Sequence, residues 1–518
     1  GKQPGILINE TGTEVSLPIV YGKARVGISR VDVRQGTDAD VLALVGVIAL
    51  APEGGSSTAQ QGIEEVTTVF FDGDAALSSP IFGANDSGTN NPTPFNASVI
   101  ESPWNGNVTS GAFGTNYWLE YFIHDGDDAQ VVDRELNRIF GATPWGTYAR
   151  GVGLSYIVLW LYFDDDVFAN GVPQVTMDVK GNKVASVLDS TADFRYSENP
   201  VDCALDFMTS TRYGMGIPTA QMDWGQTVLQ ANPITTVSGS TVITVAHSAA
   251  HNALVGDRVI LSKATAVGGI TAARLNVQMT ITGATATNFT ATLGGANATS
   301  AATGGGSAVR LDISSFGEAA YYCDEPVTIT LTSGTRALTN RFTANGWLDS
   351  ADTPQTNLDR LLSACSGRIV REGGKYKLLI RKVQAVSSFE LDRSNIVGEW
   401  SFAKGGVDEV SNTQVVTFVD KDQNYQPVPL VYPRATTTNA FLAADFAYGV
   451  EQRIDLPFTE DAHMAQMINA ATFNESRADM SCSLVAQREA LRLSVGDVVN
   501  VTHSTPGWTD QPMWVEAV

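Results

Sequence analysis

Acidic clusters are the first candidates for chemistry in this sequence. Asp164, Asp165 and Asp166 are adjacent, and three carboxylates could bind a metal ion or supply an acid pair. They follow an apolar run directly, and neighbouring side chains of an extended chain point in different directions, so a solvated turn is the favoured interpretation. Residues 420–424 open like a calcium-binding loop, but Tyr425 stands where that loop needs glycine and Val431 where it needs an acid. We therefore expect no metal site at either cluster.

Histidines and nucleophiles give no stronger signal. The histidines are scattered along the chain: His124, His247, His251, His463 and His503. His247 and His251 are four residues apart, but their segment has the pattern of strand and loop, so a shared zinc ion is a minority interpretation. The chain has no nucleophile elbow, phosphate-binding loop or HExxH motif. Ser155 lies in a predicted buried strand, which favours a structural role.

Tryptophans and paired carboxylates leave a sugar-binding or glycosidase site open. Trp347, Trp400, Trp508 and Trp514 could line a sugar site, yet each lies in or beside a predicted strand, which favours a core or interface role. Among 55 acidic residues, a catalytic carboxylate pair would show itself only by its spacing in the folded chain. The residues thus name no catalytic, cofactor-binding or metal-binding group, and we expect no cofactor.

The cysteines and the hydropathy pattern bear on the compartment. Cys203, Cys323, Cys365 and Cys482 are far apart, with no CxxC pair, so we expect buried thiols. No apolar run has the length of a membrane-spanning helix, and residues 1–12 lack the features of a signal peptide. Synthesis in a cytosol and soluble assembly are expected. Residues 514–518 stop within an apolar alternation, so we also expect the molecule to continue past Val518.

Length, composition and charge bound the class of protein. A chain of 518 residues is too long for one core, and three or four domains are expected. An apolar share of 43% with 48 glycines favours short strands joined by turns, so the fold class is α+β and β-dominated. The formal charge of −22 repels phosphate backbones. Nucleic acid is therefore an improbable direct ligand, and sequence-specific binding to it is not expected.

One stretch organises the expected sheets. Residues 156–163 form a continuous apolar run, long enough for a strand that is buried on both faces. Residues 170–173 supply a tight turn, and Val175, Met177 and Val179 then alternate with polar residues. This pattern predicts an antiparallel hairpin, with a second turn at residues 180–182.

The remaining pattern predicts further strands and a few helices. Strands are expected at residues 6–8, 17–26, 41–50, 118–124, 326–329, 341–344, 369–370, 376–380, 413–419, 485–491, 498–502 and 513–515, with a hairpin turn at Gly373 and Gly374. Helices are expected at residues 199–211, 218–224, 312–324, 357–366 and 459–478, the first capped by Asn199 with proline next to it. Residues 79–109 have the composition of a loop.

A change of composition indicates an inserted module. Residues 236–311 are rich in Thr, Ala and Gly, nearly lack aromatic residues, and contain strand patterns at residues 241–246, 258–261 and 278–281. The expected division has an N-terminal β-rich region with a long loop at 1–150, a domain at 151–235 and 312–390, the small β-module at 236–311, and a further domain at 391–518.

A series of short segments along the chain forms a recognisable combination. It consists of PIVYG at 18–22, the elements of 156–181, FMTSTRYGMG at 207–216 after Asn199 and Pro200, FTANGW at 342–347, SACSG at 363–367 followed by 375–378, and GDVV at 496–499 followed by 501–503. In this order the series resembles the tail tip host-specificity proteins of lambda-like siphophages, which are similar to baseplate hub proteins. The likeness covers most of the chain, apart from residues 79–109 and 236–311.

The resemblance implies a non-enzymatic part of a virion. Such proteins form a homotrimer of β-barrel-like hub domains at the distal end of the tail, close the tail tube, and help to couple host adsorption to DNA release. The implied partners are the distal tail ring protein, the tail tube, the tape-measure protein and a host cell-surface receptor, the last through regions past residue 518. The implied location is the virion tail tip after assembly in the host cytoplasm.

Two other classes remain open at this point. A secreted β-rich glycan-binding protein would show calcium-dependent sugar binding and monomeric behaviour. A cell-wall hydrolase would show activity that is lost when one acid is changed. An acidic ring around a DNA conduit would repel the passing genome, which fits the hub better than either alternative.

Overall fold

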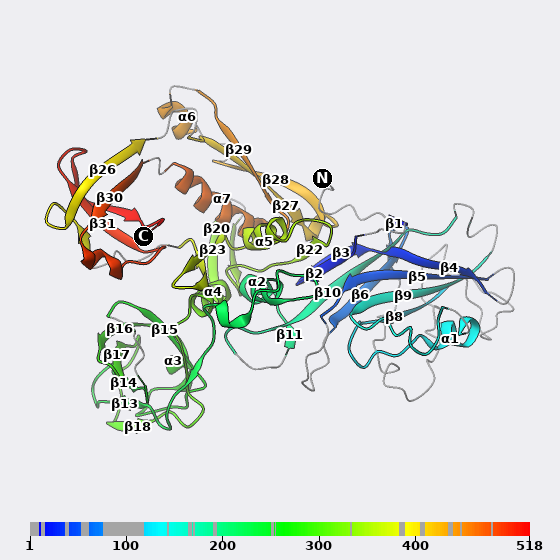
Figure 1. Ribbon diagram of the computed structural model, residues 1–518, viewed down its shortest axis with the longest axis horizontal. Helices are drawn as coiled ribbons and strands as arrows, with labels where there is room; N and C mark the ends of the chain where they lie inside the picture. The colour runs from blue at the N-terminus through cyan, green and yellow to red at the C-terminus, as the bar shows by residue number, and fades with distance from the viewer. Residues whose placement is uncertain are drawn as a thin grey trace.

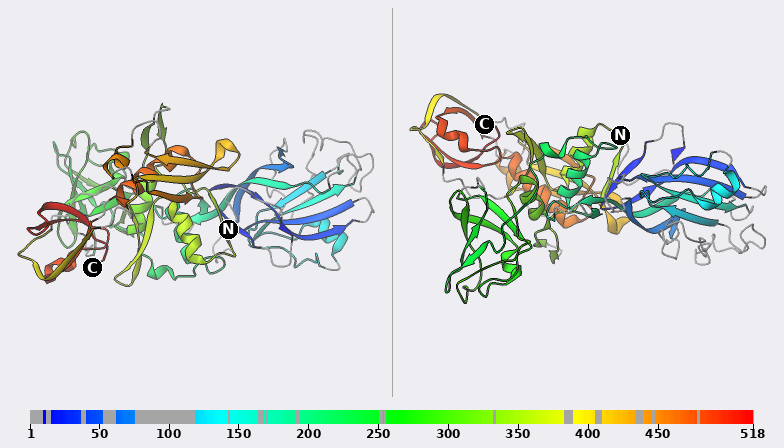
Figure 2. Two further views of the ribbon diagram at one scale, coloured as in Figure 1. Left: turned by 90° about the horizontal axis from the view of Figure 1, so that it is seen from above. Right: turned by 60° about the horizontal axis from the view of Figure 1, so that its bottom comes forward.

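The fold is that of a multidomain, β-dominated α+β protein. A computed structural model describes residues 10–517, except for 12–15, 37–40, 53–61, 76–118, 142–143, 164–167, 169–170, 190–193, 250–252, 254, 332–333, 383–388, 405–409, 434–438, 446–447 and 478–479. The strand expected at residues 6–8 and the loop at 79–109 lie outside this part of the chain. Figure 2 shows a β-sandwich at one end, helices in the middle, and two further β-units at the other end.

The N-terminal part is a two-layer β-sandwich (Figure 1). One sheet has the order β1-β4-β5-β9-β8, and the other has β11-β10-β6-β7 with β3 also paired to β10. The strands are β1 Glu10–Thr11, β3 Lys23–Gly27, β4 Ser29–Gln35, β5 Val41–Leu50, β6 Ile63–Phe71, β7 Asp74–Ala75, β8 Leu119–His124, β9 Leu154–Tyr162, β10 Val175–Ala185 and β11 Phe194–Tyr196. The strand expected at 41–50 is confirmed, and β8 covers residues 119–124 of the one expected at 118–124, whose first residue lies outside the described part of the chain.

Strand β9 is buried on both faces, as its apolar run predicts. Its odd-numbered side chains from Ile157 to Leu161 pack into the core between the two sheets. Its even-numbered side chains from Tyr156 to Trp160 pack on the other side, with Leu136 of α1 (Arg134–Phe140). Because successive side chains of a strand alternate between faces, two separate cores require an uninterrupted apolar sequence.

The expected hairpin between β9 and β10 is wrong. Strand β9 pairs with β5 and β8, whereas β10 pairs with β3, β6 and β11. Both edges of β9 are therefore occupied, and the connection carries the chain across to the opposite sheet. The two strands share the core between the sheets instead of a ladder of hydrogen bonds.

The second turn expected at residues 180–182 is also wrong, because β10 continues to Ala185. Gly181 lies where strand β10 passes very close to Val20. A Cβ atom at this position would lie 2.1 Å from the carbonyl oxygen of Val20. The Gly181 amide donates to the carbonyl of Gly22 over 2.8 Å.

The centre of the molecule is a core built by helices and strands from distant parts of the chain, including residues of α7 (Ala462–Ser476) and β27 (Thr413–Asp420). Helices α2 (Pro200–Thr209), α4 (Ser315–Asp324) and α5 (Pro354–Ser363) bury their apolar faces in one cluster with β2 (Pro18–Tyr21) and β22 (Gly346–Asp349). The neighbouring elements are η1 Thr219–Gln221, β20 Val327–Leu331, β21 Gly334–Leu338, β23 Gly367–Glu372 and β24 Lys375–Ile380. The hairpin turn between β23 and β24 at Gly373 and Gly374 is confirmed.

Capping explains where the helices begin. The Asn199 side chain accepts from the amide of Val201, with Pro200 in the first turn of α2, as predicted. Helix α5 begins earlier than expected because Thr353 caps it. The helix expected at 218–224 is only the short 3₁₀ turn η1. None of the helices in the described part of the chain combines the length and apolar composition needed to cross a membrane.

The strand expected at residues 341–344 is wrong, and the nearby strand β22 begins at Gly346. The amide of Phe342 donates to Cys323, that of Ala344 to Glu198 and that of Asn345 to Phe458. Backbone groups that bond to three separate segments cannot form a regular ladder. This segment is a crossing point in the core.

The inserted module is a separate β-unit around its own core. Its strands have the order β12-β19-β15-β16-β17-β14-β13-β18. They are β12 Thr227–Val228, β13 Ile234–Thr236, β14 Val242–Ala246, β15 Arg258–Ser262, β16 Gln278–Ala284, β17 Asn288–Thr292, β18 Ala302–Gly304 and β19 Arg310–Asp312, with the short helix α3 Ala272–Leu275. Figure 1 shows this unit projecting from the central helices near α4.

The C-terminal part has two β-units. In one, β28-β27-β29 form a sheet on which the long helix α7 (Ala462–Ser476) packs. In the other, β25-β31-β32 and the ribbon β26-β30 enclose a small core. The elements are β25 Glu390–Leu391, β26 Ile396–Lys404, β27 Thr413–Asp420, η2 Lys421–Gln423, β28 Gln426–Tyr432, α6 Ala440–Ala444, β29 Glu451–Leu456, β30 Met480–Ala486, η3 Arg488–Arg492, β31 Val498–His503 and β32 Trp508–Trp514. The strand expected at 485–491 is largely wrong, since β30 ends at Ala486 and η3 follows.

Candidate functional site

The acidic and histidine clusters show no metal site in the part of the chain that the structure describes. No three His, Cys, Asp or Glu side chains among the described residues gather closely enough to hold a metal ion. The calcium-like segment is a capped turn in which the Asp420 carboxylate accepts from the amide of Asp422. Asn424 and Tyr425 follow with φ of 55° and 57°. The acids at 164–166 and His251 lie outside the described residues, so those interpretations stay predictions.

Ser155 and His124 have structural roles. The Ser155 hydroxyl is fully buried and donates to the carbonyl of His124 over 2.8 Å. The His124 ring stacks on Tyr156 with centroids 4.3 Å apart, and its Nε2 lies 3.0 Å from the carboxylate of Asp133, which caps α1. The histidine and the serine thus hold β8, β9 and α1 together.

Two of the tryptophans meet in the C-terminal unit. The ring centroids of Trp400 and Trp508 are 5.8 Å apart, and His503 lies 3.6 Å from Trp400. Trp508 is buried in the small core there. Trp347 and Trp514 lie elsewhere, on β22 and at the end of β32. This arrangement agrees with the core role that the sequence favours.

The cysteines are thiols, as expected. All four are free; Cys203, Cys323 and Cys365 are buried, and Cys482 is partly exposed. Burial raises the pKa of Cys203 and Cys323 well above the usual value, which keeps these thiols protonated.

The strongest candidate for a functional site is the joint between the sandwich and the central core. Strands β2 and β22 form a two-stranded antiparallel ribbon there, which we call the joint ribbon. Ile19 lies opposite Leu348, and both side chains enter the central core. Val20 lies opposite Trp347, and these side chains pack into the sandwich core. One ribbon therefore belongs to two cores at once.

A buried acid ties the joint ribbon to helix α2. The Asp206 carboxylate accepts from the hydroxyl of Tyr21 over 2.6 Å and from that of Tyr213 over 2.8 Å. Burial raises the pKa of Asp206 to about 6, although both hydroxyl hydrogen bonds oppose the shift. Burial also raises the pKa of both tyrosines, so their hydroxyls remain donors.

A close backbone approach fixes the end of the ribbon. Gly22 has φ of 59°, and a Cβ atom there would lie 2.0 Å from the carbonyl oxygen of Ala344. The amide of the next residue, Lys23, donates to the side chain of Asn345 over 2.7 Å. Only glycine satisfies both the left-handed backbone and the short approach.

Charged pairs surround this joint. Lys23 Nζ lies 3.2 Å from the Glu198 carboxylate, and Arg25 pairs with Asp178 at 2.6 Å while its guanidinium lies 4.0 Å from the Phe70 ring centroid. These groups are partly exposed, so they contribute little stability each and mainly fix orientation.

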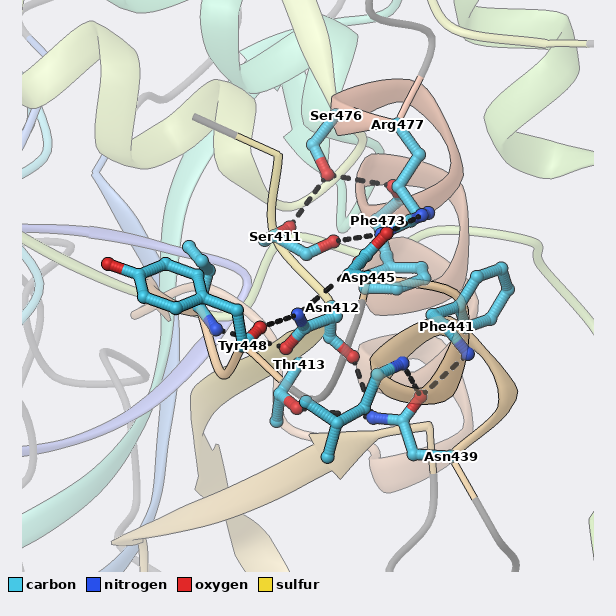
Figure 3. A network of polar contacts seen from close by, with 12 residues as sticks. Ser411, Asn412, Thr413, Asn439, Phe441, Asp445, Tyr448, Phe473, Ser476 and Arg477 are labelled. Carbon is cyan, nitrogen blue, oxygen red and sulfur yellow. Dashed lines mark hydrogen bonds and ion pairs between the residues drawn. The ribbon is translucent and has the colours of Figure 1, made fainter. Parts of the chain in front are cut away.

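A second polar network holds the sheet of β27 against helix α7 (Figure 3). Asn412, which is almost fully buried, donates to the carbonyl of Tyr448 over 2.6 Å and accepts from the amide of Val450 over 3.0 Å. Arg477, just past α7, donates to both carboxylate oxygens of Asp445 at 2.9 and 3.1 Å. The network fastens the segment that contains α6 to the end of α7 and the start of β27.

The joint brings together segments that the sequence singled out separately. Tyr21 and Gly22 belong to the first segment of the resemblance, Tyr213 to the third and Asn345 to the fourth. The pairings join residues 185 and 322 positions apart in the sequence. The sequence did not identify Asp206 and Asn345 as partners of the ribbon, because such distant contacts leave no local pattern. The glycine at the end of PIVYG was the one available sign that the backbone there is unusual.

Comparisons with known proteins give one family and one fold. Residues 353–511, from the start of α5 into β32, match the family model Phage-tail_3, described as putative phage tail protein. Among solved structures, a chain from the "virion of native gene transfer agent (GTA) particle" is similar, with 14% sequence identity, a TM-score of 0.51, and coverage of 100% of this chain and 85% of that chain. No curated protein matches the chain in sequence. The family match and the shared fold together support a structural protein of a phage-type tail.

Proposed function

We propose that the chain is a non-enzymatic structural protein of a phage-type tail, and that three copies form the hub that closes the distal end of the tail tube. The observation that carries the proposal is the match of residues 353–511 to a phage tail protein family, within a chain that shares its whole fold with a virion protein. The finer features, namely the trimer, the tip position and the coupling of host adsorption to DNA release, rest on the resemblance of the joint segments.

The joint ribbon supports a mechanical role. A domain boundary crossed by a flexible linker permits relative motion of the two parts. Here the boundary is crossed by paired strands whose alternate side chains are buried in both cores. Such a joint couples the sandwich to the helices more firmly than a flexible linker would, which suits a part that must hold a tube closed.

Exposed apolar side chains on the β26–β30 ribbon support assembly. Phe402 is 50% exposed, Val397 59% and Val485 57%. Phe402 lies directly opposite Cys482, on the face that also carries Trp400, whereas Val485 lies on the other face, so both faces of the ribbon expose apolar side chains. A two-stranded ribbon is marginal by itself, and exposed large apolar side chains are available to a partner. We propose that neighbouring copies meet at this ribbon.

The acidic charge supports a position around a conduit for DNA. A formal charge of −22 disfavours adhesion of the passing genome to the wall. The remaining proposed partners are the distal tail ring protein, the tail tube, the tape-measure protein and a host receptor.

We also propose the domain division inferred from the sequence, with one change. The sheet of the inserted module begins with β12 at Thr227 and ends with β19 at Asp312, so its bounds are better placed at 227–312 than at 236–311. The hub domain around the central core then consists of residues 151–226 and 313–390.

Native mass spectrometry of the purified chain tests the trimer. A species of three times 55.1 kDa is expected. The double variant Phe402→Asp, Val485→Asp should shift it to monomer, because charges would be buried between copies. The matched control is Val255→Asp, a substitution at a 62% exposed position of the inserted module, which should leave the trimer intact.

Electron microscopy of assembled particles tests the position. Density with threefold symmetry is expected at the distal end of the tail tube. A chain that stays monomeric at high concentration and is absent from the tail tip would refute the proposal.

A further inference from the structure

A row of threonines crosses the outer face of the inserted module. Thr303 lies opposite Thr235, Thr235 opposite Thr244, and Thr244 opposite Thr290 on four successive strands, β18, β13, β14 and β17. Thr282, at a bulge of β16, continues the row, because its hydroxyl oxygen lies 3.1 Å from that of Thr290. We call these five residues the threonine row.

The row faces outward. The residues that flank it on the same strands, such as Ile234, Ile243 and Phe289, are buried in the core of the module. Directly paired residues of an antiparallel sheet share a face, so the threonines all lie on the opposite side. Thr235, Thr282 and Thr303 are exposed, and Thr244 and Thr290 are partly exposed. Figure 1 shows β13, β14 and β18 at the end of the module away from α4.

Charged residues are absent from the five strands that carry the row. None of the strands β13, β14, β16, β17 and β18 contains an ionisable residue. The whole segment 227–312 has four basic and two acidic residues, hence +2, and the other residues must carry −24 to give the total of −22. All six of its charged residues lie outside these five strands: Asp257, Arg258, Lys263, Arg274, Arg310 and Asp312. A partner recognised by ion pairs, such as a phosphate group or an anionic lipid, finds no charged side chain on these five strands; Arg258 of β15 lies on the same face beside the end of the row, opposite Thr280.

The composition of the face also disfavours a protein partner. The cores of protein interfaces are enriched in aromatic residues, Met and Arg. The outward residues here are Thr, Val, Ala, Asn and Gly, for example Val242 opposite Thr292 and Ala246 opposite Asn288. The chemistry offered is a set of hydroxyl groups beside methyl groups.

This chemistry complements a polymer with repeated hydroxyl groups. A threonine hydroxyl is both donor and acceptor and rotates to suit its partner. Neighbouring strands place equivalent groups about 4.8 Å apart, so the row repeats regularly along its length. Because β-branched side chains have restricted χ1 angles, little conformational entropy is lost when they bind.

We propose that the threonine row is a binding site for neutral polysaccharide, such as uncharged glycan chains of a cell envelope. The inference goes beyond the proposed hub, because it concerns one module of a single chain and does not require a trimer. Cross-strand threonine pairs also stabilise a sheet, and the variants below separate that contribution from binding.

Affinity electrophoresis of the full chain in native gels tests the site. The gels contain dextran, mannan or galactan as neutral probes, and alginate or dextran sulfate as anionic probes. We expect at least one neutral polysaccharide to retard the protein and neither anionic polysaccharide to do so. Retardation by the anionic probes alone, or by none of the five, would overturn the proposal.

Two triple variants distinguish binding from folding. Thr235→Val, Thr244→Val, Thr290→Val keeps the β-branched shape but removes the hydroxyls, and should raise the apparent dissociation constant at least tenfold. The same positions changed to Ser keep the hydroxyls and should retain most of the binding. The matched control is Thr265→Val, at an exposed position off the row, which should bind as the wild type does.

The outcome is independent of the hub. If the valine variant binds as well as the wild type, the row is not the site, whatever the oligomeric state. If the variant loses polysaccharide binding while native mass spectrometry still shows the same oligomer, the site is established apart from assembly. Circular dichroism checks that the sheet of the variant is intact.

Discussion

Adjacent residues of the joint ribbon should perturb different parts of the molecule. Ile19 and Val20 are both fully buried, but Ile19 lies in the central core and Val20 in the sandwich core. Ile19→Ala removes three carbon atoms, worth about 2.4 kcal/mol of transfer free energy, and the cavity term brings the expected loss to about 3–4 kcal/mol. Val20→Ala removes two carbon atoms, and the expected loss is about 2–3 kcal/mol.

Native-state hydrogen exchange read by mass spectrometry locates each loss. Ile19→Ala should lower protection first in α2, α4 and α5, whose buried faces share the core with Ile19. Val20→Ala should lower it first in β6, β9 and β10. The matched control is Ile243→Ala in the separate core of the module, which should leave protection in both regions unchanged.

Two results would contradict a ribbon shared between two cores. If both variants lower protection equally in the helices and in the sandwich, the ribbon does not divide its side chains between two independent cores. If neither variant lowers it by more than about 1 kcal/mol, the packing of the joint is not what holds the two parts together.

Three further predictions concern single groups. The raised pKa of Asp206, about 6, means that the folded state binds a proton more readily than the unfolded chain, so its contribution favours folding most below pH 4 and declines as the pH rises to 6. Asp206→Asn should therefore reduce the loss of unfolding free energy between pH 4 and pH 7 by about 2 kcal/mol in denaturant titrations, and an unchanged pH profile would contradict this. Gly22→Ala should lower the free energy of unfolding by more than about 3 kcal/mol, because the added Cβ would clash with the carbonyl oxygen of Ala344. Gly225 has φ of 115° but open space around it, so Gly225→Ala should cost only about 1–2 kcal/mol. Equal shifts of the melting temperature in the two variants would be inconsistent with the close approach at Gly22. Asp445→Asn removes the carboxylate that accepts both hydrogen bonds from Arg477. Because this pair fastens the segment to the end of α7, the variant should be cleaved faster by proteases in residues 434–450. A cleavage rate like that of the wild type would show that the network does not hold this segment.

The local sequence sufficed where one element decides its own conformation. The run in β9 specified a strand between two apolar layers, since only alternation between two cores needs every side chain to be apolar. Asn199 and Pro200 specified the start of α2, because a cap acts on amides of the same turn. The paired glycines at 373 and 374 specified a hairpin, since both adopt positive φ there.

Tertiary structure decided what depends on distant partners. The pattern after β9 predicted a hairpin, but which strand lies beside which depends on the edges of β9 that β5 and β8 already occupy. Gly181 and Gly22 are both turn-forming residues by type; one lies within a strand and the other at a crossing, because each meets backbone from another segment. The threonine row likewise exists only after five strands, spread over residues 234–304, are set in register.

The sequence by itself therefore determined the β-dominated class, the start of α2 and the acidic character of the chain, all of which follow from residue type and short-range period. The structure alone decided that a two-stranded ribbon belongs to two cores and that Asp206 lies between two tyrosines. Contacts across 185 or more residues leave no local pattern, because their free energy is gained only when the cores that bring them together have formed.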